Sequence, residues 1–149
     1  MHLFIKMEGK VFNKVLCSKK GKRWRALFEL VKAIAISLGI AVICLALVAT
    51  LWQQPLALAI SLLIVSWWVL SWHKQKEELL LYIIIGIGGP LGEIIAIHFG
   101  AWSYSLPQVI GIPIWLPPLW ALAGVLTKWS WDEVVLHYKL KNSYSSKHH

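Results

Sequence analysis

Glu93 is the residue whose chemical type and position most strongly suggest a function, because it is the only acidic residue within the apolar stretch 79–99. A carboxyl group inside a membrane is energetically costly, so intramembrane acids are rare and usually functional. Burial favours the protonated form of a carboxyl group, and a protonated carboxyl group could deliver a proton to an alkene. The alternative is structural: Glu93 would then only hydrogen-bond a neighbouring helix.

The helix that must position this carboxyl group has a face of small residues. Helical periodicity places Tyr82, Gly86, Gly89 and Glu93 on one side, and small residues allow another helix to approach closely. Glu93 lies about 14 residues past Leu79, or ~21 Å at ~1.5 Å per residue, which places it in the outer half of a bilayer. We therefore expect its side chain to point into protein or a cavity rather than into lipid.

His98 is a second candidate catalytic residue, at the end of the same stretch. It lies five residues after Glu93, so the two side chains point about 140° apart on an ideal helix, although Pro90 could change that angle. A histidine that binds a metal needs partner ligands, and the sequence shows none at a recognisable spacing. We therefore expect no metal and no cofactor.

Four aromatic residues lie downstream, namely Trp102, Tyr104, Trp115 and Trp120. With Tyr82 they are candidates to line a pocket for a flat or polyunsaturated hydrocarbon, and aromatic rings also stabilise cations. The plainer interpretation is an aromatic belt at the outer boundary of the membrane. Prolines in this region bend or break helices, and irregular backbone at membrane depth must be buried in protein or line a cavity.

Residues 86–120 carry Gly, Pro and aromatic residues in a recognisable order. That order is Glu93, the run Phe99-Gly100-x-Trp102-x-Tyr104, Leu106, the run Ile110-Gly111-Ile112-Pro113, and then Pro117 and Trp120. The segment resembles the membrane carotenoid-biosynthesis family that includes the carotenoid hydratases, with the membrane lycopene cyclases as looser relatives. Trp102 and His98 stand where that family has tyrosine and proline. The resemblance implies hydratase-like or cyclase-like chemistry on an isoprenoid alkene.

The composition of the chain is that of a membrane protein. Its 149 residues are 58% hydrophobic with a mean hydropathy of +0.62, whereas soluble domains are about 45–50% apolar. The apolar residues form runs close to the roughly 20 residues that a membrane-spanning helix needs. The predicted spans are 33–52, 55–72, 79–99 and 113–127. The sequence therefore predicts an all-α integral membrane protein with four transmembrane helices, in a membrane domain of residues 26–129.

The basic residues predict the orientation of these spans. All 15 Lys and Arg residues lie before the apolar core of the first span, between the second and third spans, or after the fourth. Basic residues are retained on the cytoplasmic side of a membrane. This distribution favours four spans in the cell (plasma) membrane with both termini in the cytoplasm, because an odd number would place one basic end outside.

Both ends of the chain are predicted to lie at the cytoplasmic face. Residues 1–25 combine apolar residues at helical spacing with regularly spaced lysines, which predicts a basic amphipathic helix on the surface of anionic lipid. Because this location explains the basic charge, we expect no nucleic-acid binding. Ser130 and Glu133 match a capping box, so residues 130–149 are predicted to form a short helix to about Lys141 and then a disordered tail.

These features lead us to expect a small membrane protein with an outer-half pocket for an isoprenoid-like or lipid molecule. In an enzyme, Glu93 would be the general acid and the aromatic residues would stabilise a carbocation. The chain could instead be a non-catalytic scaffold or accessory subunit, in which Glu93 would hold helices together by hydrogen bonding. Gly88 and Gly92 also form a Gly-x-x-x-Gly motif, which allows another helix to approach closely. A third alternative is a small transporter or proton-conducting element. A homo-oligomer or a larger membrane complex suits all three.

Overall fold

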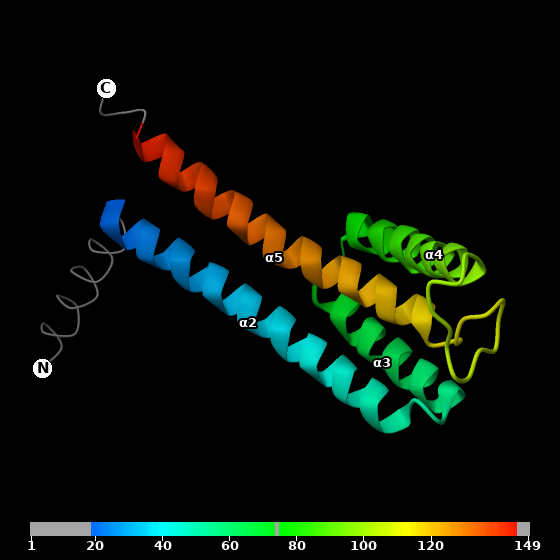
Figure 1. Cartoon of the computed structure of the whole chain (residues 1–149). Helices are drawn as coiled ribbons and strands as arrows, with labels where there is room; N and C mark the ends of the chain where they lie inside the picture. Colours follow the sequence, from blue (N-terminus) through cyan, green and yellow to red (C-terminus); the bar gives the residue numbers. More distant parts are fainter. Residues whose placement is uncertain (1–18, 74, 146–149) are drawn as a thin grey trace, which may run out of the picture. The chain divides into compact units, whose positions relative to one another are not determined.

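The computed structural model describes residues 19–73 and 75–145, and these residues form helices and connecting loops with no β-strand. The helices are α2 (Lys19–Leu51), α3 (Pro55–His73), α4 (Lys76–His98) and α5 (Leu116–Ser145) (Figure 1). The predicted all-α class is confirmed for the described part of the chain. Residues 1–18 lie outside the described residues. The amphipathic surface helix predicted within residues 1–25 therefore falls mostly on residues that the structure does not describe.

Three of the described helices are long and apolar enough to cross a membrane. They contain the segments Trp24–Leu51, Pro55–Trp72 and Lys76–His98, which correspond to the first three predicted spans. A helix of 33 residues such as α2 is about 50 Å long, well beyond the ~30 Å of hydrocarbon in a bilayer. α2 therefore continues past any membrane that its apolar part crosses.

The last helix differs from the prediction in where it begins and how far it continues. α5 begins at Leu116, with Pro117 and Pro118 in its first turn, where a proline is tolerated because the N–H groups there have no intrahelical acceptor. It then runs without a break to Ser145, so the prediction of a separate short helix from Ser130 is wrong. A capping box starts a helix only where the preceding backbone is not helical, and here that backbone already belongs to α5.

Contacts between residues divide the chain into two compact units, Ser37–Lys128 and the combination of Met1–Ile36 with Trp129–His149. In the first unit, α4 and α5 run antiparallel at very close range. A Cβ atom added to Gly86 would lie 3.0 Å from the Cβ of Ala121, and one added to Gly124 would lie 2.9 Å from Ile85 Cγ1. The predicted glycine face of α4 does pack against another helix, as close approach through small residues requires.

The beginning of α5 supplies much of the buried core of this unit. Its apolar residues at helical spacing are almost fully buried, namely Leu116, Ala121, Leu122, Val125 and Leu126. They lie in the same unit as buried residues of the other helices, including Ile40, Cys44, Leu58, Leu62 and Val69. The Ser37 hydroxyl donates a hydrogen bond to the Leu126 carbonyl oxygen at 3.4 Å, which ties α2 to α5. α5 is therefore an internal helix along its first turns.

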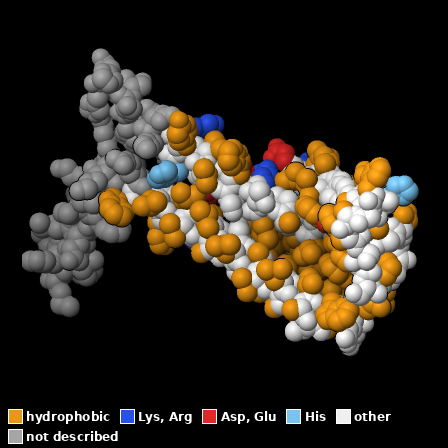
Figure 2. All heavy atoms as spheres, in the orientation of Figure 1, with side chains coloured by type: hydrophobic (Ala, Val, Ile, Leu, Met, Phe, Trp, Pro, Cys, Tyr) orange, Lys and Arg blue, Asp and Glu red, His pale blue; other side chains and the backbone are white. Residues whose placement is uncertain are grey.

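Apolar side chains also cover much of the outside of the described structure (Figure 2). In the most apolar part of α4 only 6% of the residues are buried, against 22% in the most apolar part of α3. Exposed apolar surface of this extent is unusual for a soluble monomer and is the normal state of a helix whose outer face meets lipid. The second unit also exposes aromatic side chains, including Trp24 and Phe28 on α2 and Trp131 and Tyr138 on α5.

Candidate functional site: a carboxylate held by two aromatic donors

Glu93 accepts hydrogen bonds from two aromatic side chains of the loop that follows α4. The indole Nε1–H of Trp102 donates to Glu93 Oε2 at 2.9 Å, and the Tyr104 hydroxyl donates to the same oxygen at 3.2 Å. Among the described residues no hydrogen bond to the other oxygen, Oε1, is formed. Both bonds end on one oxygen, so Glu93 acts only as an acceptor toward Trp102 and Tyr104.

The end of α4 turns the chain so that these two aromatic residues reach back to Glu93. Gly100 has φ 78°, the left-handed conformation that favours glycine. Its N–H donates to the Ile97 carbonyl oxygen, and the Ala101 N–H donates to that of Ala96. This pair of bonds is a Schellman motif, which ends the helix sharply and reverses the chain direction within two residues. Trp102 is the next residue and therefore lies beside the last turns of α4.

A tight turn then returns the chain to α5. Val109 and Ile112 exchange two backbone hydrogen bonds of 3.0 and 2.9 Å, and the residues between them, Ile110 and Gly111, have φ of 46° and 84°. Two left-handed residues in succession define a type I′ turn. The Gln108 side chain braces it, because its Oε1 accepts the Ile114 N–H at 3.2 Å. The loop between α4 and α5 is thus an ordered element that fixes the position of Trp115.

Trp115 connects the carboxylate cluster to the core. Its ring lies 6.2 Å from the Tyr104 ring in an edge-to-face arrangement, a favoured geometry for aromatic pairs. Trp115 is only 9% exposed, whereas Trp102 is 50% exposed. The predicted site residues Glu93, Trp102, Tyr104 and Trp115 are therefore brought together, with a buried side at Trp115 and an open side at Trp102. We call these four residues the Glu93 cluster.

Trp120 lies one helical turn below this cluster. Its ring covers Gly89, since a Cβ atom at position 89 would lie 2.5 Å from the ring carbons. Glu93 is the next residue along the same face of α4, about 6 Å further on. Trp120 is 38% exposed, so a partly open aromatic surface continues from Trp102 toward the middle of α4.

Two other predicted site residues do not join the cluster. The Tyr82 hydroxyl donates to Ser66 Oγ at 2.9 Å and so links α4 to α3. His98 packs edge-on against Phe99, with ring centroids 5.5 Å apart, and forms no bond to Glu93 within the described structure. The structure therefore gives His98 no role beside the carboxylate, and Tyr82 acts as a connection between helices.

Burial and the negative charge of Glu93 raise the pKa of Tyr104, and no Lys or Arg lies near Glu93 in the sequence. Burial raises the pKa of the Tyr104 phenol, and the negative charge of Glu93 and the hydrogen bond to it raise that pKa further. The sequence has no Lys or Arg between Lys76 and Lys128. Both groups that hold Glu93 are thus neutral, and the site keeps a net negative charge when its carboxyl group is ionised.

Sequence reasoning missed two polar residues that the fold uses. Glu78, which lies between the second and third predicted spans, is 2% exposed in the first turn of α4, where the helix dipole favours an acidic side chain. Ser66, the acceptor for Tyr82, is 3% exposed within α3. Its sequence context of apolar neighbours carries no signal for that role, whereas the pair Glu77-Glu78 before an apolar run is a helix-start pattern that could have been recognised.

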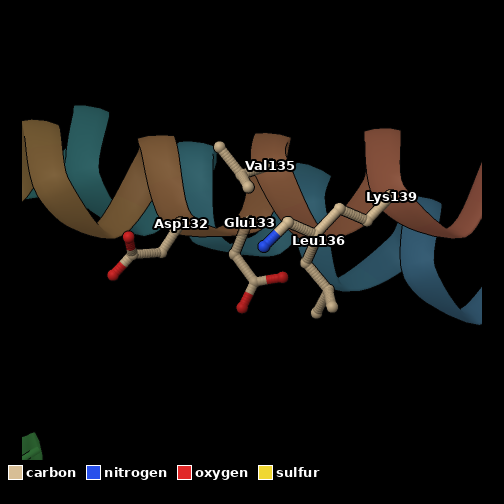
Figure 3. A pocket seen from close by; sticks show the side chains of 5 residues that line it. All are labelled: Asp132, Glu133, Val135, Leu136 and Lys139. Atoms are coloured by element: carbon tan, nitrogen blue, oxygen red, sulfur yellow. The ribbon is translucent and has the colours of Figure 1, made fainter.

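A surface depression lies elsewhere in the chain, on α5, and is lined by Asp132, Glu133, Val135, Leu136 and Lys139 (Figure 3). All five side chains come from consecutive turns of one helix, and they carry charges of both signs. The described residues bring no three His, Cys, Asp or Glu side chains together as metal ligands. The Glu93 cluster therefore remains the candidate functional site.

Comparisons of the chain with known proteins found no similar protein. No protein-family model matches the chain, and neither a curated protein nor a solved structure matches it. The resemblance of residues 86–120 to carotenoid hydratases stays a prediction.

Proposed function

We propose that this chain is a small multi-pass membrane protein that binds an isoprenoid-like or lipid molecule at the Glu93 cluster, in the outer half of the membrane. The observation that carries the proposal is the pair of hydrogen bonds from Trp102 and Tyr104 to a carboxylate at the apolar end of α4. A polar group at that depth is costly, and here an ordered loop holds it beside half-open aromatic rings. Such a surface offers a polar anchor next to apolar contacts.

The proposed topology has four spans with both termini in the cytoplasm. α5 lacks the length of apolar sequence of the other three helices, but its antiparallel pairing with α4 supports a fourth crossing. Residues pair as Gly89 with Trp120 and Ile85 with Gly124, so α5 returns toward the side on which α4 begins. Burial of its first turns also lowers the need for lipid-compatible side chains. The distribution of Lys and Arg favours the same arrangement.

The geometry supports binding more than acid catalysis. A general acid must carry a proton that it can deliver to substrate, and the two hydrogen bonds at Oε2 supply none, because their protons belong to Trp102 and Tyr104. His98, the second candidate catalytic residue, packs on Phe99 instead of joining the carboxylate. Acid-catalysed alkene chemistry at Glu93 would need the proton on Oε1. We therefore place the hydratase-like or cyclase-like activity second to binding.

A different observation favours the role of scaffold or accessory subunit. Gly88 and Gly92 face away from the glycine contacts with α5, and a Cβ atom added at either position would meet nothing within 4 Å. A Gly-x-x-x-Gly motif left open in this way suits the approach of a helix from another chain. In that case Glu93 would serve only to hold the loop, and removing the aromatic surface would not change lipid retention.

Native mass spectrometry of the purified chain can test the binding proposal. The protein is equilibrated in micelles with geranylgeraniol or dioleoylglycerol, and the retained molecules are counted. Wild type should retain one of these probes, and Trp102→Ala and Trp120→Ala should lose it, because both substitutions remove open aromatic surface. The matched control is Trp67→Ala, since Trp67 lies on α3 and is 79% exposed. Equal retention by all four proteins would reject the proposal.

A further inference from the structure

The charge balance around Glu93 indicates what kind of head group the site would take. Trp102 and Tyr104 are neutral donors, and each uses one bond to hold Oε2. Oε1 stays available to a ligand, since the described residues place no donor on it. With no Lys or Arg in residues 79–127, an ionised Glu93 is a single negative charge in an apolar setting. Such a charge attracts a cation far more strongly than it would in water.

The aromatic rings beside the carboxylate are placed where they could bind a cation. An indole N–H lies in the plane of its ring, so the hydrogen bond from Trp102 uses the ring edge and leaves the two π-faces free. Trp102 is half exposed, so a ligand can approach this residue from outside the protein. Cations bind favourably over the face of tryptophan and tyrosine. A carboxylate and open aromatic faces together form the kind of site that recognises quaternary ammonium groups.

The surroundings of the cluster suit the rest of an amphiphile. The partly exposed Trp120 ring covers Gly89, which lies one turn before Glu93 on the same face of α4, so an aromatic surface continues from the carboxylate into the membrane segment. A hydrocarbon chain lying along this surface would bury apolar area at Trp102 and Trp120. The head group would then lie at Glu93, and the chain would extend along α4 toward the membrane centre.

We propose that the ligand of the Glu93 cluster is an amphiphile with a positively charged head group, of the quaternary ammonium class. This inference rests on the proposed function and adds the charge of the ligand to it. Glu93 supplies the counter-charge, and the faces of Trp102 and Tyr104 supply cation–π contacts. An anionic head group would be repelled by the same carboxylate.

A pair of lipids that differ only in the head group can test this inference. Dioleoyl trimethylammonium propane and dioleoylglycerol carry the same acyl chains, and one has a trimethylammonium group where the other has a hydroxyl group. The full-length protein is offered an equal mixture, and the retained lipid is identified by native mass spectrometry. Wild type should retain the cationic lipid about tenfold over the neutral one, a difference of ~1.4 kcal/mol. Glu93→Gln should remove this preference, and Glu93→Asp should keep part of it.

The controls separate a failure of this inference from a failure of the proposed function. Glu77→Gln removes an exposed acid at the opposite end of α4 and should leave the preference unchanged. Equal retention of both lipids by wild type, with loss of both in Trp102→Leu, would overturn the charge inference and keep the proposed site. Retention of neither lipid would overturn both. A preference that survives in Glu93→Gln would place the cation elsewhere and reject the inference. If Glu93→Gln does not stay monodisperse, loss of the preference in Trp102→Leu decides the question.

Discussion

Gly89 and Trp120 are in such close contact that a Cβ atom at position 89 would lie 2.5 Å from two ring carbons of the indole. Real Cβ contacts are not this short, and the atoms involved are at the base of the ring rather than at its far end. Gly89→Ala should therefore push α4 and α5 apart or displace Trp120, at a cost of about 1–3 kcal/mol, typical of overpacking. Equilibrium unfolding of the purified protein in mixed micelles measures this cost.

Gly88→Ala is the matched control for that substitution. Position 88 is the neighbouring residue on the same helix, and an added Cβ atom would meet nothing within 4 Å. The change should be neutral or slightly stabilising, because alanine favours helix over glycine by about 1 kcal/mol. Similar destabilisation by both substitutions would mean that the α4–α5 contact is not the one described.

Gly88 and Gly89 show which part of the helix packing could be predicted from the sequence. Helical periodicity placed Gly86, Gly89 and Glu93 on one face of a helix, and the contacts of Gly86 and Gly89 with α5 bear this out. The same sequence contains Gly88 and Gly92, which read equally well as a packing motif and face open space. Which of two interleaved glycine faces is used depends on where the rest of the chain lies, and local periodicity carries no such information.

The sequence was enough to predict which residues form the Glu93 cluster, but it did not predict the hydrogen bonds between them. Glu93, Trp102, Tyr104 and Trp115 were candidates because polar and aromatic residues at a membrane boundary are informative. The direct bonds to Glu93 depend on the Schellman motif at Gly100 and on the turn at Gly111, which together reverse the chain. The length of α5 was missed for a simpler reason: a capping-box pattern can occur inside a helix, where it has no free N–H groups to cap.

Ile110 is a point of backbone strain in the loop that forms the site. Its φ of 46° is in the left-handed region, which is unfavourable for a β-branched residue by roughly 1–2 kcal/mol. Its side chain is 75% exposed, so little packing offsets this cost. Ile110→Asn, which gives the Asn-Gly pair preferred in type I′ turns, should raise the unfolding free energy by about 1 kcal/mol. Val109→Asn, one residue earlier at ordinary φ, should not; a gain in both or in neither would contradict the assigned turn.

The phenol of Tyr104 should ionise at higher pH than an ordinary tyrosine, because burial, the charge of Glu93 and their hydrogen bond all raise its pKa. A raised pKa in the folded state contributes stability that is fully present below the pKa of the unfolded chain. That contribution is lost as the pH rises through the folded-state pKa. Phenolate absorbance, taken as the difference between wild type and Tyr104→Phe, isolates this residue. In Glu93→Gln the transition should shift to lower pH, and an unchanged transition would show that the carboxylate does not act on Tyr104.

The proposed topology predicts which positions a membrane-impermeant thiol reagent can reach in intact cells. Ser105, in the loop between α4 and α5, should be external, and Gln75, just before α4, should be internal. In a background without Cys17 and Cys44, Ser105→Cys should be labelled and Gln75→Cys only after the cells are opened. Labelling of Gln75→Cys alone would reverse the orientation. A cysteine at Lys128 provides the test of the fourth span, because that position should also be protected until lysis.

The two hydrogen bonds to Glu93 should stabilise the loop between α4 and α5. Two substitutions distinguish the loss of the acceptor oxygen from the loss of the negative charge. Glu93→Ala removes the acceptor and leaves the Trp102 and Tyr104 donors without it, which should cost about 1–2 kcal/mol, the range of side-chain hydrogen bonds in membrane proteins. Glu93→Gln keeps a carbonyl oxygen of the same reach as acceptor and should cost much less. Hydrogen exchange of the backbone between Ala101 and Gln108, together with the unfolding free energy, reports both effects. Trp102→Phe in the Glu93→Ala background should add little, because the bond is already gone; a full additional loss would mean that Trp102 stabilises the loop without the help of Glu93.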